Sequence, residues 1–310
     1  MHEPIPVTVV GGALGSGKTT LVNHVLRQSR GRRLAVLVND FGELDIDEEM
    51  IESTGIDTIS LRNGCICCSL GGGLTDGLAA LRAADNPPEH ILVEASGVSL
   101  PARIAGAAGG PGLRLDGILI VVDAVDIPRR TRDRYVGETV RDQLASADML
   151  VLNKVDEATP AELSAARALL AGQARGVPLV EAAYGAIPLD VVLGPGDRPG
   201  RDRAGRKTAL TRADHRHTDL ETASFTSEAP IEAAGLDRWL AELPDGMLRA
   251  KGFVRLAGDP PSARRVQVVG SRRRLTPVDP ATAGPDTHLV AIAVPGSLGP
   301  QPFLALTDTS

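Results

Sequence analysis

The feature that most constrains the fold is a series of short apolar runs in the first 190 residues, spaced by helix-like segments. The runs are rich in Val, Ile and Leu and show no polar alternation, which is typical of parallel strands buried on both faces. The predicted strands are "IPVTVV" (5–10), "RLAVLVN" (33–39), "DTISL" (57–61), "HILVEA" (90–95), "GILIVVD" (117–123), "DMLVLN" (148–153) and "VPLVEA" (177–182).

Segments rich in Ala and Leu lie between these runs and predict crossover helices, as in "TTLVNHVLRQ" (19–28) and "PAELSAARALLAGQ" (160–173). Thr159 and Pro160 have the residue types of an N-cap and a first helical residue. Strands alternating with helices predict an α/β fold, a doubly wound and mainly parallel sheet. Such sheets bind ligands at the carboxyl ends of their strands.

Residues 194–217 break this pattern, because they are rich in Gly, Pro and Arg and have no apolar face. We therefore expect a first domain over 1–193, a flexible linker over 194–217, and a second domain over 218–310. The second domain has strand-like runs and one expected helix, an order that predicts a smaller α+β fold. Its predicted elements are strands at 222–228, 247–256, 264–270 and 288–294, and a helix near 231–243.

Composition excludes several functional classes for the 310-residue chain. A net charge of −6 argues against a nucleic-acid binder. The absence of a long apolar run and of a leader-like start argues against a membrane span or a signal peptide. The three cysteines lie too close together to form a disulfide framework, so we expect a cytoplasmic protein. Because only 2% of residues are aromatic, we expect a core of aliphatic side chains.

The stretch "GALGSGKT" (12–19) fits the phosphate-loop pattern G-x-x-x-x-G-K-[ST], with a predicted strand before it and a helix after it. Its glycines let backbone N–H groups surround phosphate oxygens, and the helix N-terminus favours negative charge. Lys18 is expected to reach the outer phosphates and Thr19 to ligate Mg²⁺. The predicted phosphate-binding residues are Gly12, Gly15, Ser16, Gly17, Lys18, Thr19 and Thr20.

The tetrapeptide "NKVD" (153–156) follows a later predicted strand. The Asp156 carboxylate can accept two hydrogen bonds from the edge of guanine, which adenine does not offer. Asn153 and Lys154 are expected to hold the loop and cover the base. Behind a phosphate loop, this pattern favours GTP over ATP, whereas a P-loop kinase would not need it.

Two carboxylates compete for the Mg²⁺-coupled position. Glu94 precedes Ser96-Gly97, where the backbone can meet the γ-phosphate and Gly97 can move with nucleotide state. Asp123 also ends a predicted strand, but helix capping explains it equally well. We therefore favour Glu94.

An acidic segment, "VNDFGELDIDEEM" (38–50), occupies the position of a nucleotide-sensing switch between the phosphate loop and Glu94. Asp47 or Asp40 is expected to position the attacking water or contact Mg²⁺. The alternative is a solvated acidic turn.

All three cysteines lie in "RNGCICCSLGGGL" (62–74), as Cys65, Cys67 and Cys68. Thiolates suit Zn²⁺, Cu(I) or iron–sulfur centres, and three of them leave a tetrahedral site one ligand short. An open position lets a site pass its metal on, and Glu43 in the switch is the internal candidate for an additional ligand. Buried inert thiols or a redox-sensing loop are the alternatives.

Together, "GALGSGKTT", "NDFGELDID", "GCICCS", "EASG" and "NKVD" resemble the CobW-type P-loop GTPases, relatives of the urease and hydrogenase nickel-insertion GTPases. The likeness extends to "MLRAKGFVRL" (247–256) in the second domain.

The resemblance implies Mg²⁺-dependent GTP hydrolysis coupled to delivery of a transition metal, in zinc homeostasis, cobalamin synthesis or nitrile hydratase maturation. It implies catalytic roles for Lys18 and Glu94 and a metal site at the cysteines. Many members carry a histidine-rich linker, whereas this chain has only His215 and His217 there.

Two functional hypotheses follow from the sequence. One is a GTP-switched metallochaperone carrying Zn²⁺, or Co²⁺, to a client metalloprotein, with a homodimer as one way to complete the metal site. The other is a GTP-dependent interaction switch in which the cysteines only shape a partner-binding surface.

Overall fold

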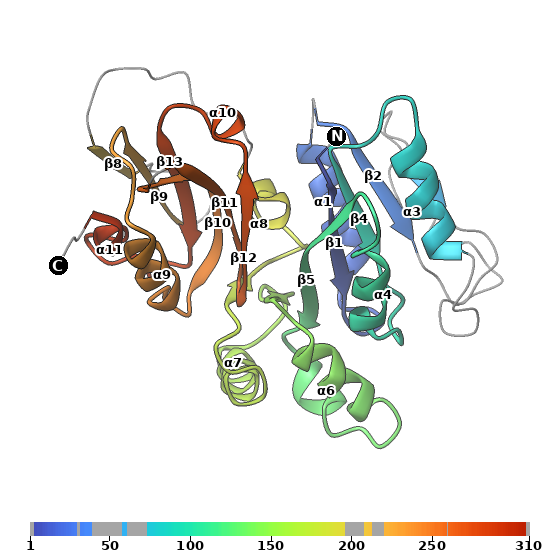
Figure 1. The fold of residues 1–310 in the computed structure, drawn as a ribbon. Coiled ribbons are helices and arrows are strands. Elements are labelled where there is room, and N and C mark those ends of the chain that lie inside the picture. The colour runs from blue at the N-terminus through green and yellow to red at the C-terminus, as the bar shows by residue number, and fades with distance from the viewer. Residues whose placement is uncertain are drawn as a thin grey trace. The chain divides into compact units, whose positions relative to one another are not determined.

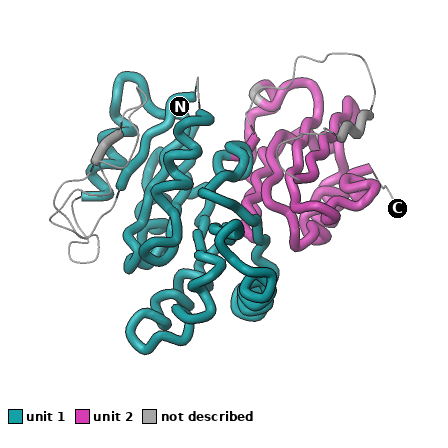
Figure 2. The backbone as a smooth tube through the Cα atoms, turned by 180° about the vertical axis from the view of Figure 1, so that it is seen from behind, with its two compact units in different colours: residues 1–193 teal, residues 194–310 magenta. Residues whose placement is uncertain are grey.

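The computed structural model describes residues 3–29, 32–38, 58–60, 73–195, 208–212, 220–258 and 260–307. For residues 58–60, 208–212 and 282 it describes the backbone alone. The chain divides into two compact units, residues 1–193 and 194–310 (Figure 2). Each unit has its own sheet and its own hydrophobic core.

The first unit is built on a seven-stranded sheet in which every neighbouring pair is parallel (Figure 1). All seven apolar runs form strands, which confirms the doubly wound α/β class. From edge to edge the order is β3 (Thr58–Ser60), β2 (Leu34–Val38), β4 (His90–Glu94), β1 (Ile5–Gly11), β5 (Leu113–Asp123), β6 (Met149–Asn153) and β7 (Leu179–Glu181).

Helices cover both faces of this sheet (Figure 1). Side chains of α3, α4, α6 and α7 join strand residues in one core cluster, and α1 packs on the other face with Leu21 and Val25 fully buried. The helices are α1 (Lys18–Gln28), α3 (Gly73–Ala83), α4 (Pro101–Ala107), α5 (Ile127–Arg130), α6 (Gly137–Ala145), α7 (Pro160–Gln173) and α8 (Leu189–Leu193).

Strand β1 lies where the direction of winding reverses. The chain passes from β4 on one side of β1 to β5 on the other. The loops that follow these strands therefore diverge at the carboxyl edge of the sheet, which is where open α/β sheets bind their ligands. The loop after β1 contains the predicted phosphate site, so the topology places that site at the point of reversal.

Strand β5 begins earlier than the predicted run 117–123, at Leu113. The additional residues include Arg114 and Asp116, whose charges argue against a buried strand. Both side chains are nevertheless buried, because Arg114 Nη1 donates to Asp116 Oδ1 at 3.1 Å. Their pairing offsets part of the free-energy cost of burying the two charges.

The second unit has a six-stranded antiparallel sheet with a short helix against it, which confirms the smaller α+β domain. Its strands, in sheet order, are β12 (Arg272–Val278), β11 (Ser262–Val269), β10 (Met247–Leu256), β13 (Thr287–Ala293), β9 (Glu221–Ser227) and β8 (Thr208–Arg212). Its helices are α9 (Ala233–Ala241), α10 (Pro280–Ala283) and α11 (Leu304–Thr307).

Aromatic side chains contribute more to this second core than the composition suggested. Trp239 stacks on Phe303 at 5.6 Å between ring centroids, and Phe225 lies 5.5 Å from Phe303. The Trp239 Nε1–H donates to Pro302 O at 2.8 Å, so the buried indole keeps a partner. Among the described residues, the prediction of an aliphatic core therefore holds for the first unit and is wrong for the second.

Two strands were missed because their composition masks them. Residues 208–212, which we assigned to the flexible linker, form β8 and pair with β9. "TALTR" has the Thr and Leu content of a strand, but the surrounding Arg and Gly obscure it. Strand β12 holds three consecutive arginines and is largely exposed at the sheet edge, where charged residues are tolerated.

No helix of the described segments is long and apolar enough to span a membrane.

Helix α7 begins with a capping box, and this provides a test of the fold. Thr159 Oγ1 accepts from Glu162 N, while Glu162 Oε2 accepts from Thr159 N at 2.8 Å. We expect Thr159→Ala to lower the free energy of unfolding by about 1 kcal/mol, because it leaves a helix-end N–H without its acceptor. Urea denaturation measures this, with Ser164→Ala, an exposed mid-helix change, as the control. Equal stability of the two variants would contradict the role of the cap.

Candidate nucleotide-binding site

The loop between β1 and α1 depends on glycines with left-handed backbones. The φ angles of Gly12, Gly15 and Gly17 are 135°, 77° and 97°. A Cβ at Gly12 would lie 2.1 Å from Val121 O, and one at Gly17 would lie 2.2 Å from Asn153 Nδ2. A Cβ at Gly15 would meet nothing within 4 Å. The loop is therefore packed against the sheet at two points and open at the third, as a phosphate cradle requires.

Lys18 and Thr19 occupy the first turn of α1. The Lys18 Nζ donates to Ala13 O at 3.2 Å, so the ammonium lies across the loop. Thr19 Oγ1 donates to Glu94 Oε1 at 2.7 Å. Two residues 75 positions apart in the sequence are thus joined where β1 and β4 run side by side. Of the other predicted loop residues, Ser16 is buried and Thr20 is exposed.

The two competing carboxylates have different surroundings. Glu94, at the end of β4, is only 3% exposed and contacts the phosphate loop through Thr19. Asp123, at the end of β5, accepts hydrogen bonds from Val125 N at 2.9 Å and Asp126 N at 3.2 Å. Its other oxygen lies 2.7 Å from Lys154 Nζ. Asp123 therefore shapes the turn after β5 and binds the lysine of "NKVD", whereas Glu94 lies beside the phosphate loop.

The turn after Glu94 packs directly on the phosphate loop. A Cβ at Gly97 would lie 2.5 Å from Leu14 N, so only glycine allows this approach. The Gln143 side chain of α6 donates to Gly97 O at 3.2 Å and to Ser99 O at 2.9 Å. This buried glutamine fixes α6 to the turn, and its role has no signal in the sequence.

Asn153 connects the phosphate loop to the loop after β7. Its Nδ2 donates to Ser16 O at 2.9 Å, and its Oδ1 accepts from Gly185 N at 2.8 Å. The side chain is 2% exposed, so both bonds are shielded from water. The predicted task of holding the loop fits this geometry. Gly185 was not predicted. Its loop follows β7, which is the neighbour of β6 in the sheet, so the strand order brings this loop close to Asn153 at the end of β6.

The remaining residues of "NKVD" face the solvent to different extents. Lys154 has a left-handed φ of 62° and is half-buried. The hydrogen bond that the Lys154 ammonium donates to the Asp123 carboxylate raises the pKa of Lys154 above its usual value. Asp156 is exposed and has no hydrogen bond or ion pair among the interactions that the described residues show. Its carboxylate is thus accessible to a ligand at the carboxyl edge of the sheet.

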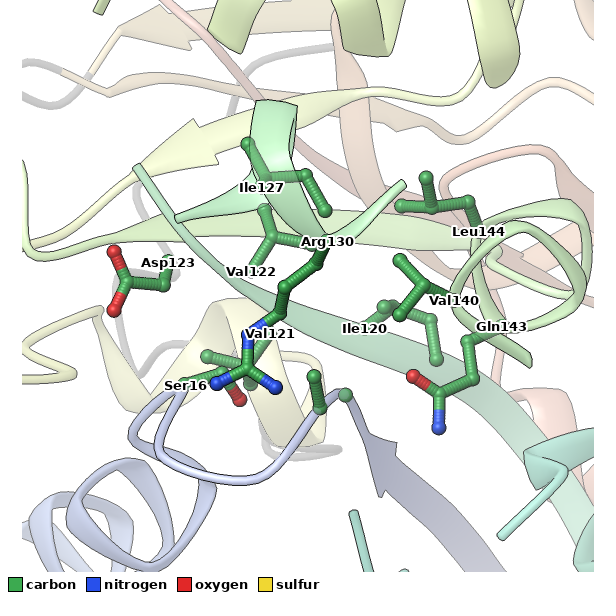
Figure 3. Close-up of a pocket in the computed structure, with 12 residues that line it drawn as sticks. Ser16, Ile120, Val121, Val122, Asp123, Ile127, Arg130, Val140, Gln143 and Leu144 are labelled. Atoms are coloured by element: carbon green, nitrogen blue, oxygen red, sulfur yellow. The ribbon is translucent and has the colours of Figure 1, made fainter. Parts of the chain in front are cut away.

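A small cavity of about 10 Å³ lies between the phosphate loop, β5, α5 and α6. In Figure 3 the Arg130 side chain extends from α5 toward Ser16, and Asp123 stands to one side. The volume suits one water molecule and is far too small for a nucleotide. This cavity is therefore not a candidate for the nucleotide site.

Several predicted site residues lie outside the described residues. They are Asp40, Glu43, Asp47, Cys65, Cys67, Cys68, His215 and His217. Within the described residues, no group of three or more His, Cys, Asp or Glu side chains is arranged to hold a metal ion. The roles assigned to individual site residues stay predictions.

Asn153 provides a direct test of how the loops are joined. We expect Asn153→Ala to lower the free energy of unfolding by about 1–3 kcal/mol, because it leaves buried backbone groups without partners. It should also weaken GDP binding, since the phosphate loop loses its anchor. Thermal unfolding and GDP titration measure the two effects. Asn86→Ala, at an exposed loop position, is the matched control, and an Asn153 variant that behaved like it would contradict the anchoring role.

Comparison with known proteins matches both units. The model of the CobW/HypB/UreG nucleotide-binding domain matches residues 6–180, and that of the cobalamin synthesis protein cobW C-terminal domain matches residues 220–299. A relative from Pseudomonas aeruginosa named "Zinc chaperone CobW" is 36% identical over 308 residues, covering 86% of this chain and 81% of the relative. A protein of the same name from Sinorhizobium sp is 32% identical over 305 residues, covering 86% of each.

Among solved structures, the Zn(II)-bound YjiA GTPase from E. coli is similar at 22% identity, with 99% of each chain covered and a TM-score of 0.46. The two domain matches together span most of the sequence and agree with the sheet topology and the phosphate loop described above. The chain belongs to the CobW/HypB/UreG family and is a P-loop GTPase with a cobW C-terminal domain.

Proposed function

We propose that this GTPase is a metallochaperone in which the bound nucleotide controls the holding of Zn²⁺ by the cysteine loop. The observation that carries the proposal is the 2.7 Å hydrogen bond from Thr19 to Glu94, which links the phosphate loop to β4. Strand β4 pairs with β2, and β2 pairs with β3, the strands that precede the acidic segment and the cysteine loop in the sequence. The names of the relatives support zinc as the cargo.

The residues of the phosphate loop have distinct proposed roles. The backbone N–H groups between Gly12 and Thr19 bind phosphate oxygens, and the Lys18 ammonium neutralises charge that develops during hydrolysis. The Thr19 hydroxyl and the Glu94 carboxylate are oxygen donors, which suit Mg²⁺. They would hold that ion, which shields the negative charge of the phosphates when it is bound. Asp47, outside the described residues, is proposed to orient the attacking water.

The base is proposed to bind at the loop after β6. Asp156 is exposed there and accepts from the guanine edge, while Asn153 keeps the loop against Ser16. Lys154, fixed by Asp123, presents its aliphatic stem to the ring. Gly97 lies against Leu14 of the phosphate loop, where its N–H is suited to meet the γ-phosphate.

The sheet register supports the proposed coupling between metal holding and nucleotide state. Strands β3, β2 and β4 are neighbours, with Val38 opposite both Ser60 and Glu94. Adjacent strands are about 4.8 Å apart, so the chain leaves β2 and β3 within roughly two strand spacings of Glu94. In the sequence, β2 is followed by the acidic segment with Asp40, Glu43 and Asp47, and β3 is followed by the cysteine loop.

A thiolate site with three cysteines suits Zn²⁺, and Co²⁺ has closely similar ligand preferences. Glu43 would supply a further ligand only in the state that brings the acidic segment close. Release of the ion then delivers it to a client metalloprotein. A cytoplasmic location and a homodimer completing the site stay predictions.

Guanine reading by Asp156 can be tested by Asp156→Asn. We expect GDP affinity to fall roughly 10- to 100-fold, because two charge-assisted hydrogen bonds are lost. We expect XDP to bind more tightly than it does to the wild type, since the amide can donate to the additional carbonyl of xanthine. Competition titrations against a fluorescent GDP measure both. Asp190→Asn, on α8, is the control, and unchanged GDP affinity in Asp156→Asn would rule out this base site.

Nucleotide control of metal holding is tested by Zn²⁺ affinity, measured against a chromophoric chelator. We expect one ion per chain, with an affinity that differs about 5- to 150-fold between GDP and a non-hydrolysable GTP analogue with Mg²⁺. Replacing Cys65, Cys67 and Cys68 by Ser should abolish binding. Glu94→Gln should bind GTP but hydrolyse it slowly, so that the GTP-state affinity persists.

The outcomes separate the two functional hypotheses. Equal Zn²⁺ affinity in both nucleotide states would overturn the coupling. Zn²⁺ binding that ignores the cysteines would favour the interaction switch, in which these residues only shape a surface. A parallel titration with Co²⁺ decides which ion the site prefers.

A further inference from the structure

The loop after β7 contains a residue in an unusual conformation that the proposed nucleotide chemistry has not yet used. Among the non-glycine residues that the structure describes, two have φ in the left-handed region, Lys154 at 62° and Tyr184 at 53°. A bulky residue rarely adopts this conformation unless its surroundings impose it, and such residues gather at ligand sites. Both lie at the proposed base site, on the loops after β6 and β7.

Tyr184 is held in this conformation by contacts on either side of it. Val155 N donates to Ala182 O at 3.3 Å, and Ala186 N donates to Ala183 O at 2.9 Å. Gly185 N donates to Asn153 Oδ1 at 2.8 Å. A Cβ at Gly185 would lie 2.7 Å from Leu21 N, so the chain here passes directly against α1. The backbone around Tyr184 is thus fixed to the "NKVD" loop and to the helix that follows the phosphate loop.

The constrained backbone does not bury the Tyr184 ring. It is 72% exposed, although the core offers aliphatic surface for an aromatic ring. A strained backbone that presents a large, rigid and exposed ring fits a stacking platform for a planar ligand. Because Asn153 orders this loop and the neighbouring Lys154 and Asp156 together, the planar ligand expected there is a purine base.

We propose that the ring of Tyr184 stacks on the purine of the bound nucleotide, so that this residue supplies affinity while Asp156 supplies the choice of guanine. This assignment rests on the proposed base site at "NKVD". Stacking depends on the face of the base and not on its hydrogen-bonding edge, so the two contributions are separable. Loss of the ring weakens all purine nucleotides alike, whereas loss of the Asp156 carboxylate changes the preference among them.

The test compares GDP and IDP binding to the full chain by calorimetry for the wild type, Tyr184→Ala and Tyr184→Phe. We expect Tyr184→Ala to weaken both nucleotides roughly 10-fold, the loss of one stacked base, and to leave their ratio unchanged. Tyr184→Phe should bind within about 2-fold of the wild type, because the ring and not the hydroxyl makes the contact. Tyr135→Ala is the matched control, since Tyr135 is the other tyrosine of the chain and is 75% exposed.

A glycine variant separates the ring from the backbone. Tyr184→Gly also lacks the ring but adopts a left-handed φ without strain, so its thermal midpoint should not fall. We expect it to bind as weakly as Tyr184→Ala. Wild-type affinity in either variant would overturn the proposal, because the ring would then contribute nothing.

A tryptophan variant reports the contact directly. In Tyr184→Trp, GDP should quench the fluorescence of the introduced indole, a change that the wild type should not show because its single tryptophan, Trp239, is buried. Binding without quenching would overturn the stacking. Unchanged GDP affinity in Asp156→Asn would instead overturn the proposed base site itself, so the two failures are distinguishable.

Discussion

The side-chain amide of Asn153 joins three parts of the chain that meet at the carboxyl edge of the sheet. It donates to Ser16 in the phosphate loop, it accepts from Gly185 after β7, and it stands at the end of β6. Only a group with both a donor and an acceptor satisfies the two partners at once. Because the amide is buried, each bond lost would leave an unsatisfied group in a site of low dielectric. The geometry of the phosphate cradle therefore depends on a residue well outside it.

The sheet divides this site into two parts with different tasks. Strands β1, β5, β6 and β7 carry the phosphate loop, Asp123, "NKVD" and the Tyr184 loop, and hydrogen bonds join these segments to one another. Strands β4, β2 and β3 lead to Gly97, the acidic segment and the cysteine loop. The bond between Thr19 and Glu94 crosses from one part to the other. In the proposed function, recognition of the nucleotide and response to it thus lie on opposite sides of β1.

The strand pattern was predictable from sequence because strands buried on both faces consist almost wholly of Val, Ile and Leu. Strands that contain charged residues were predicted less completely, because their charges are either paired or exposed. Arg114 and Asp116 extend β5 by pairing with each other, and the arginines of β12 lie at an exposed edge. The phosphate loop and "NKVD" were identified from motifs. Gln143 and Gly185 were not, because their roles come from contacts across long sequence separations that no local pattern encodes.

The attachment of α6 to the turn at Gly97 has a consequence for any protein that binds this GTPase. Gln143 holds both Gly97 O and Ser99 O from the buried side of α6, while Glu138, Arg141 and Asp142 of the same helix are exposed. A shift of the turn must either break these bonds or move the helix. Coupling of this kind is reciprocal. A protein that bound the outer surface of α6 and shifted this helix would thereby also shift the turn at Gly97, which packs on the phosphate loop.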